Sequence, residues 1–222
     1  MSDIGYSMPN FTLEAALVGI GIALISFLIG SIPFGYIIGR FFYRTDLRKS
    51  GSGNIGAMNA LRTLGKGGAI AVLLLDALKG AIPVIAAFAI FGHTATELAQ
   101  LVASFGATFA VLGHCFSPWL GWRGGKGVAT AFGAIFAMSW PAGLVVVLGW
   151  VVGALVLTRY SSVGSMLANI VAPFALYFFT RSWAETAFGI FLAVFIVWTH
   201  RENLQRLRAG TENRISLSRK AS

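Results

Sequence analysis

Charged side chains are scarce in this sequence. Asp, Glu, Lys and Arg together make up 11% of its 222 residues, whereas soluble domains carry roughly 25%. Hydrophobic residues make up 56%, so much of the exterior must face lipid rather than water. The composition therefore excludes an ordinary soluble domain and predicts an integral membrane protein.

Cysteine is scarcer still, because Cys115 is the only one. A single cysteine excludes an internal disulfide framework and is too little for a thiolate metal cluster. No metal and no cofactor is indicated. A soluble domain, a long linker and a convincing internal repeat are lacking as well. We therefore expect one polytopic membrane domain over residues 1–222.

Apolar runs dominate what is present. Pro33 falls inside the first run, which membrane helices tolerate when neighbouring groups satisfy the freed carbonyl. The pairs Gly35–Gly39 and Gly149–Gly153 are small-xxx-small patterns that allow close helix contacts. The fourth run is short and Gly-rich. We expect an all-α bundle of about seven transmembrane helices over residues 13–39, 66–92, 97–114, 126–139, 141–158, 163–180 and 184–200.

The formal net charge of +9 is unevenly placed along the chain. On the predicted topology, 15 of the 17 Lys and Arg residues fall on one side of the membrane. The other side holds Arg181 together with Asp3, Glu14, Glu97 and Glu185. The positive-inside rule then places the amino terminus outside and the carboxyl terminus in the cytoplasm. The cations thus predict topology, and no polar domain is visible that could bind nucleic acid.

A glycine-rich segment follows the first apolar run on the cationic side. Three glycines in six residues, Gly51, Gly53 and Gly56, uncover backbone N–H groups that can approach an anion. Arg62 adds a charge with bidentate phosphate geometry. The same spacing matches a dinucleotide fingerprint, but no strand precedes it and Asp76 lies within an apolar run. We interpret the segment as an anion-binding loop, with a flexible membrane loop as the alternative.

Three further polar segments fall on the same predicted side. The Gly-Gly-Lys-Gly segment offers N–H groups and a mobile ammonium to phosphate, but it lacks the order of a P-loop. The alternatives are topology anchors, simple helix caps and an interfacial histidine. Convergence of four polar clusters on one face favours a site for phosphate-bearing ligands. The segments contain His114, Gly124, Gly125, Lys126 and Gly127, then Ser161 and Ser162, then His200, Asn203 and Glu212.

Two ionisable residues lie inside the second apolar run. Asp76 and Lys79 are three residues apart, so they share a helix face and can neutralise each other. Ionisable groups within a membrane are functional candidates by default. Their internal charge balance favours a role in holding neighbouring helices.

The sequence resembles the bacterial acyl-phosphate-dependent glycerol-3-phosphate acyltransferases, the PlsY family, over nearly the whole chain. The departures are local: Met58 stands where the family usually has Thr, Arg214 where Lys is expected, and Ser117 is an insertion. The resemblance is carried by residues 50–54 with Asn59 and Arg62, by Gly113-His114 and residues 124–130, by Ser161-Ser162, and by His200-x-x-Asn203 with Gly210-x-Glu212.

The resemblance implies transfer of an acyl group from acyl phosphate to the 1-hydroxyl of glycerol 3-phosphate. The products are lysophosphatidic acid and phosphate, as in the first acylation of phospholipid synthesis. It also implies a multi-pass protein of the bacterial inner membrane, with its active site on the cytoplasmic face and no cofactor. The oligomeric state stays open. The expected site residues are Ser50, His200 and Asn203 for catalysis, Gly51, Ser52, Gly53 and Asn54 for acyl phosphate, Arg62, Lys126 and Ser162 for glycerol 3-phosphate, and His114, Gly124, Gly125, Gly127 and Glu212 in support.

The general base is left open by the sequence. His200 has a suitable ordinary pKa near 6.5, and Glu212 is the only carboxylate in the motifs. The alternative, which we favour, is that the phosphate of the activated donor takes the proton. Cys115 beside His114 could be a nucleophile, but we interpret it as a small residue of a membrane helix. A phosphate or organophosphate transporter is the alternative function, although it would need a site near the bilayer midplane and usually two repeated halves.

Overall fold

The computed structural model describes residues 13–92 and 97–215, and within them it contains helices and no strand. Short π-helical segments at Ile38–Phe42 and Val152–Leu157 extend α2 and α7, and 3₁₀ turns lie at Leu47–Lys49 and Pro118–Leu120. The α-helices are α1 Leu13–Ser31, α2 Phe34–Ile37, α3 Ala57–Thr63, α4 Gly65–Phe91, α5 Glu97–Cys115, α6 Val128–Met138, α7 Trp140–Val151, α8 Ser161–Thr180, α9 Trp183–Thr199 and α10 Arg201–Arg208.

All seven predicted apolar stretches are helical, which confirms the all-α prediction. Helix α9 forms a sixth candidate span if it is taken together with α10, from which it is bent by 53°. Helix α6 is apolar but has 11 residues, so it is about 16 Å long against a hydrocarbon core of roughly 30 Å. Five segments are long and apolar enough to cross a membrane by themselves: Leu17–Phe42, Gly65–Phe91, Glu97–Leu120, Trp140–Leu157 and Ser161–Thr180.

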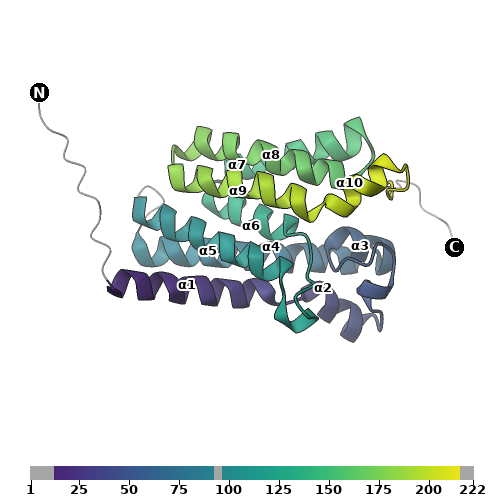
Figure 1. The fold of residues 1–222 in the computed structure, drawn as a ribbon, viewed down its shortest axis with the longest axis horizontal. Helices are drawn as coiled ribbons and strands as arrows, with labels where there is room; N and C mark the ends of the chain where they lie inside the picture. The colour runs from purple at the N-terminus through teal and green to yellow at the C-terminus, as the bar shows by residue number, and fades with distance from the viewer. Residues whose placement is uncertain (1–12, 93–96, 216–222) are drawn as a thin grey trace, which may run out of the picture.

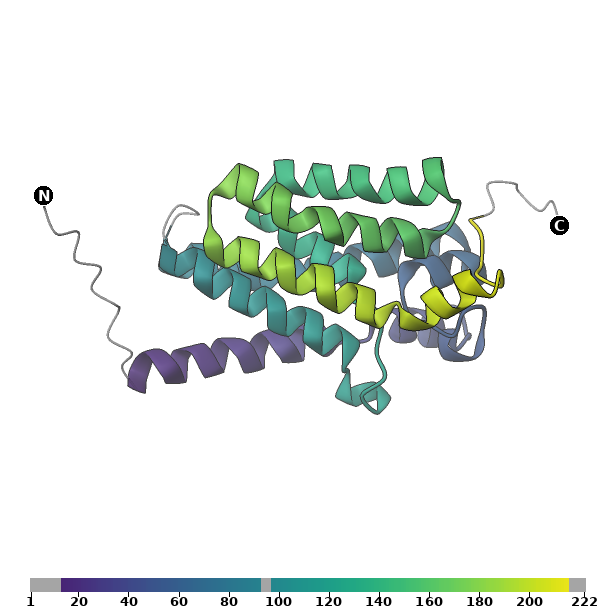
Figure 2. The same cartoon turned by 45° about the horizontal axis from the view of Figure 1, so that its top comes forward.

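The long helices lie side by side along a common direction (Figure 1). Helix α1 packs against α5, α4 packs against α5 and α6, and α8 packs against α7 and α9. The short helices α2, α3 and α10 gather at one end of the bundle in both views (Figures 1 and 2). We call this the loop end. Helix α1 begins at the opposite end, so the described chain starts and finishes at opposite ends of the bundle.

The first predicted span is interrupted near the loop end. Helix α1 ends at Ser31 and α2 begins at Phe34, with Pro33 between them. Proline has no N–H to continue the hydrogen-bond ladder of α1, and its ring disfavours helical backbone in the residue before it. Residues 17–42 still form one candidate span, so the break interrupts the helical hydrogen bonds without ending the crossing.

Glycines allow helices α4 and α6 to approach closely. A Cβ atom added at Gly80 would lie 1.9 Å from the carbonyl oxygen of Thr130, and one added at Gly133 would lie 1.9 Å from that of Ala77. No side chain fits in either place, so larger residues would force the two helices apart. These contacts place α6, which follows the Gly-Gly-Lys-Gly segment, directly on α4.

The two small-xxx-small patterns have different outcomes. Gly149 and Gly153 face α8, where a Cβ at Gly153 would lie 2.9 Å from the Cα of Gly164. That predicted helix contact is confirmed. Gly35 and Gly39 instead lie against loop carbonyls, those of Ile55 and Thr45, so the prediction of a contact between spans is wrong there. Both glycines lie beyond the break at Pro33, where the chain leads into the polar segments of the loop end.

Large apolar side chains cover the outside of the bundle, whereas its core is rich in alanine. Phe174, Val194 and Leu74 are 73%, 69% and 62% exposed. Apolar side chains in such numbers on the outside mark a surface that is covered by something other than water. A lipid environment satisfies this requirement, as the composition predicts.

Candidate active site

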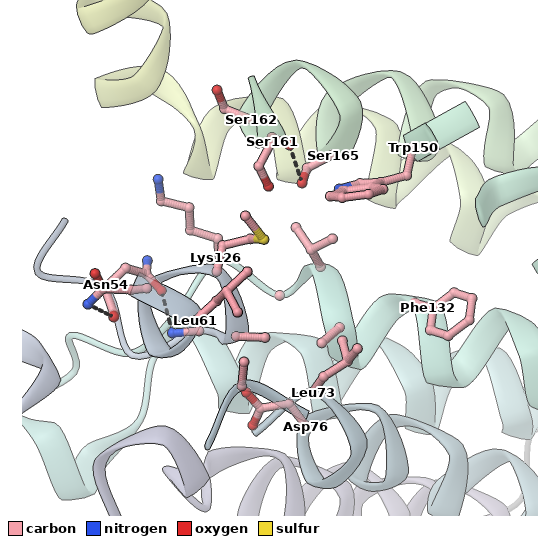
Figure 3. A pocket seen from close by; sticks show the side chains of 18 of the residues that line it. Asn54, Leu61, Leu73, Asp76, Lys126, Phe132, Trp150, Ser161, Ser162 and Ser165 are labelled. Atoms are coloured by element: carbon pink, nitrogen blue, oxygen red, sulfur yellow. Dashed lines mark hydrogen bonds between the residues drawn. The ribbon is translucent and has the colours of Figure 1, made fainter. Parts of the chain in front are cut away.

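A cavity of about 520 Å³ lies at the loop end of the bundle. Its lining comes from α3, α4, α6, α7 and α8, and from the segments that carry Lys126, His200 and Glu212. Lys126 and Ser162 lie towards Asn54, whereas Phe132 and Trp150 lie on the other side of the view (Figure 3). The cavity therefore joins a polar, cationic part to an apolar part between the helices.

The buried amide of Asn59 on α3 organises the glycine-rich loop. Its Nδ2 donates to the carbonyl oxygens of Leu47 at 3.0 Å, Ser50 at 3.0 Å and Asn54 at 2.7 Å. Its Oδ1 accepts a hydrogen bond of 2.8 Å from the N–H of Ser52. One side chain thus holds four positions of the loop, and a buried amide satisfied in this way gives the loop a single shape.

Gly51 is required by this arrangement. It adopts a φ of +58°, and a Cβ atom there would lie 2.2 Å from Oδ1 of Asn59. Ser52 and Asn54 reach the cavity lining, but Ser50, Gly51 and Gly53 are not part of it. The loop therefore presents alternate residues to the cavity, while the others hold its backbone.

The Gly124-Gly125 segment differs from the prediction. Its N–H groups donate to the carbonyl oxygens of Cys115 at 2.9 Å and His114 at 3.0 Å. These two donors are therefore not free for a phosphate, and the expectation that they bind one is wrong. The physical reason is that the carbonyls at the end of α5 have no partner in the helix and accept these N–H groups instead. Gly127 does line the cavity.

Lys126 extends from this segment into the polar part of the cavity. Its Nζ donates to Oδ1 of Asn203, and its carbonyl oxygen accepts a hydrogen bond of 3.1 Å from Thr199. Burial lowers the pKa of Lys126 to about 8, and the neighbouring Arg206 guanidinium acts in the same direction. The ammonium form still predominates at pH 7, so Lys126 brings a partly desolvated positive charge to the cavity.

His200 follows the last residue of α9 and lines the same part of the cavity. Its Nδ1 lies 2.8 Å from the carbonyl oxygen of Ile196, which assigns the hydrogen to Nδ1 and leaves Nε2 as an acceptor. Burial lowers the pKa of His200 to about 4, and the Lys126 ammonium adds to the effect. His200 is therefore neutral near pH 7 and a weak proton acceptor.

Glu212 joins two of the predicted segments. Its Oε1 accepts hydrogen bonds from Ser162 at 3.0 Å and from Asn203 at 2.6 Å, and its Oε2 pairs with Arg206 at 2.8 Å. Burial alone would raise the pKa of Glu212, but the bonds from Arg206, Asn203 and Ser162 lower it below its ordinary value. Glu212 is thus an ionised carboxylate that holds Ser162, Asn203 and Arg206 in place. It is a poor candidate for the general base.

The charges on the lining favour anions. Arg62, Lys66 and Lys126 contribute positive charge, while the two lining carboxylates, Asp76 and Glu212, each have an ion-pair partner. Arg62 also donates from Nη2 to the carbonyl of Asn213 at 3.5 Å, which holds it beside the carboxyl-terminal segment. A cavity with an excess of cations raises the local concentration of anionic ligands.

The cavity brings together predicted residues that are distant in sequence. Those on its lining are Ser52, Asn54, Arg62, His114, Lys126, Gly127, Ser162, His200, Asn203 and Glu212. The predicted residues that are not on the lining are Ser50, Gly51, Gly53, Gly124 and Gly125.

Two residues that the sequence left outside the site list take part in its geometry. Asn59 holds the glycine-rich loop, and Arg206 pairs with Glu212. Arg206 is three residues beyond Asn203, so helical spacing could have placed it on the same face.

Cys115 is buried and is not part of the cavity lining. We expect Cys115→Ser to keep near-normal turnover, because a nucleophile must reach the donor carbonyl. Incubation with a radiolabelled donor, followed by gel separation under denaturing conditions, should show no acyl group on the protein. A stable labelled wild-type band that disappears in Cys115→Ser, together with loss of turnover, would contradict this expectation.

Across residues 13–92 and 97–215, no group of three or more His, Cys, Asp and Glu side chains could hold a metal ion.

Several known proteins are similar to this chain in sequence. A family model described as glycerol-3-phosphate acyltransferase matches residues 20–210. Glycerol-3-phosphate acyltransferase of Rhodopseudomonas palustris (strain HaA2) is 45% identical over 201 residues, covering 90% of this chain and 98% of the relative. That of Agrobacterium fabrum (strain C58) is 48% identical over 210 residues, covering 94% and 97%.

A solved structure agrees as well. The glycerol 3-phosphate form of PlsY, an integral membrane glycerol 3-phosphate acyltransferase, is 37% identical with a TM-score of 0.80. The match covers 90% of this chain and 96% of that structure. The chain is accordingly an integral membrane protein with several apolar helices, and it belongs to the glycerol-3-phosphate acyltransferase family.

Proposed function

We propose that the protein transfers an acyl group from acyl phosphate to the 1-hydroxyl of glycerol 3-phosphate. The products are lysophosphatidic acid and inorganic phosphate, and the reaction is the first acylation of phospholipid synthesis. The observation that carries the proposal is the cavity itself, in which a cationic part with Arg62 and Lys126 adjoins an apolar part with Phe132 and Trp150. The solved PlsY structures include a glycerol 3-phosphate form and a lysophosphatidic acid form, which supports this acceptor and this product.

The two phosphate groups are assigned to different sides of the polar part. The loop at residues 50–54 receives the acyl-phosphate head, with Ser52 and Asn54 on the lining. Arg62, Lys126 and Ser162 receive the phosphate of glycerol 3-phosphate, and the acyl chain occupies the apolar part. Each phosphate carries a charge of about −1.5 to −2 near pH 7 by analogy with phosphomonoesters, so two cation-rich subsites are needed.

The chemical step needs no protein base in this proposal. His200 and Asn203 orient the attacking hydroxyl, whose oxygen bonds to the acyl carbonyl carbon as the bond to the phosphate oxygen breaks. The hydroxyl proton passes to the departing phosphate, which leaves as hydrogen phosphate. The low pKa of His200 and the hydrogen-bonded, ionised state of Glu212 support this route, because neither group is tuned to take a proton near pH 7.

Substrate preference of the purified protein tests the proposal. With acyl phosphate and glycerol 3-phosphate together, we expect lysophosphatidic acid and phosphate in equal amounts. With acyl-coenzyme A in place of acyl phosphate, we expect no product, because that donor has no phosphate leaving group to take the proton. Efficient transfer from acyl-coenzyme A would contradict the assignment of acyl phosphate as the donor. Movement of glycerol 3-phosphate across the membrane of vesicles that contain the protein, without acylation, would support the transporter alternative.

The membrane arrangement is part of the same proposal. We infer seven crossings, with the amino terminus outside, the carboxyl terminus and the loop end in the cytoplasm, and the bacterial inner membrane as the location. The concentration of cations around the loop end supports this orientation. The amino terminus itself lies outside the described residues.

Thiol labelling in intact cells checks the orientation. In a Cys115→Ser background, Arg181→Cys should react with a membrane-impermeant reagent from outside. Arg208→Cys should react only after the cells are opened. Both positions are exposed. Arg208 is the last residue of α10 at the loop end, whereas Arg181 connects α8 to α9 at the opposite end of these helices (Figure 1). The reverse pattern of labelling would overturn the cytoplasmic placement of the active site.

A further inference from the structure

Three buried ionisable side chains meet where α4 packs against the end of α5. Lys79 Nζ lies 2.9 Å from Asp76 Oδ1, and His114 Nδ1 lies 3.7 Å from the same oxygen. Their side chains are only 1% to 3% exposed. Asp76 and His114 line the cavity, while Lys79 stands behind them. The chemical step proposed above uses none of the three.

Lys79 ties this cluster to the break between α1 and α2. Its Nζ donates to the carbonyl oxygen of Ile32 at 2.8 Å and lies 5.7 Å from the ring centre of Phe34. The next residue, Gly35, packs so closely that an added Cβ would lie 1.8 Å from the carbonyl oxygen of Ile55. Ile55 directly follows the loop at residues 50–54, so a fixed α2 holds the end of that loop in place.

His114 ties the cluster to the opposite side of the cavity. A Cβ atom at Gly125 would lie 2.1 Å from Nε2 of His114, so the imidazole packs directly on the glycine backbone. The carbonyl oxygen of His114 also accepts the N–H of Gly125 at 3.0 Å. Lys126 is the next residue. The position of the imidazole therefore sets where the lysine backbone enters the cavity.

We propose that Asp76, Lys79 and His114 form a positioning cluster that places Lys126 and the loop at residues 50–54 for acyl transfer. The cluster acts through backbone contacts and does not touch substrate phosphates in this account. An ion pair in a low-dielectric interior must keep both partners, because removing one leaves an unpaired buried charge. Because the two charges must stay together, the pair fixes the position of α4 relative to the segments on the two sides of the cavity. The proposal rests on the acyl-transfer function proposed above.

A double-mutant cycle between His114 and Lys126 tests the inference. We expect His114→Ala to lower kcat/KM for glycerol 3-phosphate by about tenfold or more, because Lys126 is displaced. In a Lys126→Ala background, the same change should lower kcat/KM by less than about twofold, because the lysine is already absent. A purely structural role predicts an equal loss in both backgrounds, and that additive result would overturn the proposal.

Gly125→Ala disturbs the same contact between Gly125 and the His114 imidazole from the glycine side. It replaces His114→Ala in the double-mutant cycle if that variant does not fold. Its methyl group should push the segment off the imidazole, with the same loss in kcat/KM and the same weak effect in the Lys126→Ala background. An additive loss would count against the proposal here too. Ser104→Ala is the matched control, because Ser104 is buried on α5 and is not on the cavity lining; its kinetics should be unchanged.

The wild-type protein separates this inference from the proposed function. A wild-type protein that makes no lysophosphatidic acid from acyl phosphate would remove the proposed function. An active wild-type protein in which the His114 and Lys126 substitutions have additive effects would contradict only the proposal of a positioning cluster.

Discussion

Lys126→Ala is expected to lower kcat/KM for glycerol 3-phosphate roughly tenfold to 150-fold. The side chain brings a partly buried ammonium into the polar part of the cavity, where it contacts Asn203. Loss of one charge-assisted contact costs about 1.5–3 kcal/mol, and each 1.4 kcal/mol is about a tenfold change. Steady-state rates of lysophosphatidic acid formation over a range of glycerol 3-phosphate concentrations give the value.

Arg123→Ala is the matched control for this prediction. Arg123 lies three residues before Lys126, is exposed and is not on the cavity lining. Arg123→Ala removes one positive charge from the same α5–α6 connection as Lys126→Ala does. We expect near-normal kcat/KM for Arg123→Ala. Equal losses in both variants would mean that Lys126 acts only through the overall charge of this membrane face. The melting temperatures of the two variants in detergent should match the wild type.

The pKa of about 8 for Lys126 adds a pH dependence to this prediction. The ammonium is the form that binds phosphate, so kcat/KM should fall as the pH rises through about 8 in the free enzyme. Lys126→Arg should move this alkaline limb to higher pH, because a guanidinium stays protonated there. A limb that stays in place in Lys126→Arg would assign it to another group.

His200 gives the second large effect. We expect His200→Ala to lower kcat about a hundredfold, since loss of an orienting contact can misplace the attacking hydroxyl by enough to cost that factor. His200→Asn should retain a larger part of the activity, because an amide can replace the hydrogen bonds of the imidazole. Asparagine cannot take a proton, so substantial activity in His200→Asn would exclude His200 as the essential base.

The acid limb of kcat gives an independent measure of the same point. A base role requires kcat to fall as His200 becomes protonated, near its pKa of about 4 or at a value shifted by bound substrate. Proton transfer to the donor places the limb at the ionisation of the acyl phosphate instead, and it should persist in His200→Asn. A limb that disappears in a folded, weakly active His200→Asn enzyme would favour His200 as the base.

Helix positions were predictable from the sequence because a membrane restricts the backbone to few conformations. A chain in lipid must satisfy every backbone N–H within the segment, so long apolar runs with few charges become helices. The position of Gly149 and Gly153 against α8 follows from the same patterns. A break at Pro33 could be expected from the missing N–H of proline. The hydrogen bond from Lys79 to the carbonyl oxygen of Ile32 could not, because it comes from another helix.

The convergence of the polar segments was predictable, but which of their residues line the cavity and which contacts they make were predictable only in part. Polar clusters on one predicted side had to meet, and the cavity lining brings together Lys126, Ser162 and His200. The destination of the Gly124 and Gly125 N–H groups was not predictable, because it depends on carbonyls at the end of α5. Sequence spacing can predict which residues share a segment or a helix face. It cannot predict hydrogen bonds between segments that are brought together only by the packing of the helices.

Oxygen labelling of the donor tests the central claim most directly. Acyl phosphate carrying ¹⁸O at the oxygen between the acyl carbon and phosphorus is incubated with the enzyme and glycerol 3-phosphate. Attack at the acyl carbon predicts that all of this label leaves with inorganic phosphate, while lysophosphatidic acid contains none. Label that appears in a free fatty acid, together with transfer of the phosphoryl group to glycerol 3-phosphate, would contradict the account.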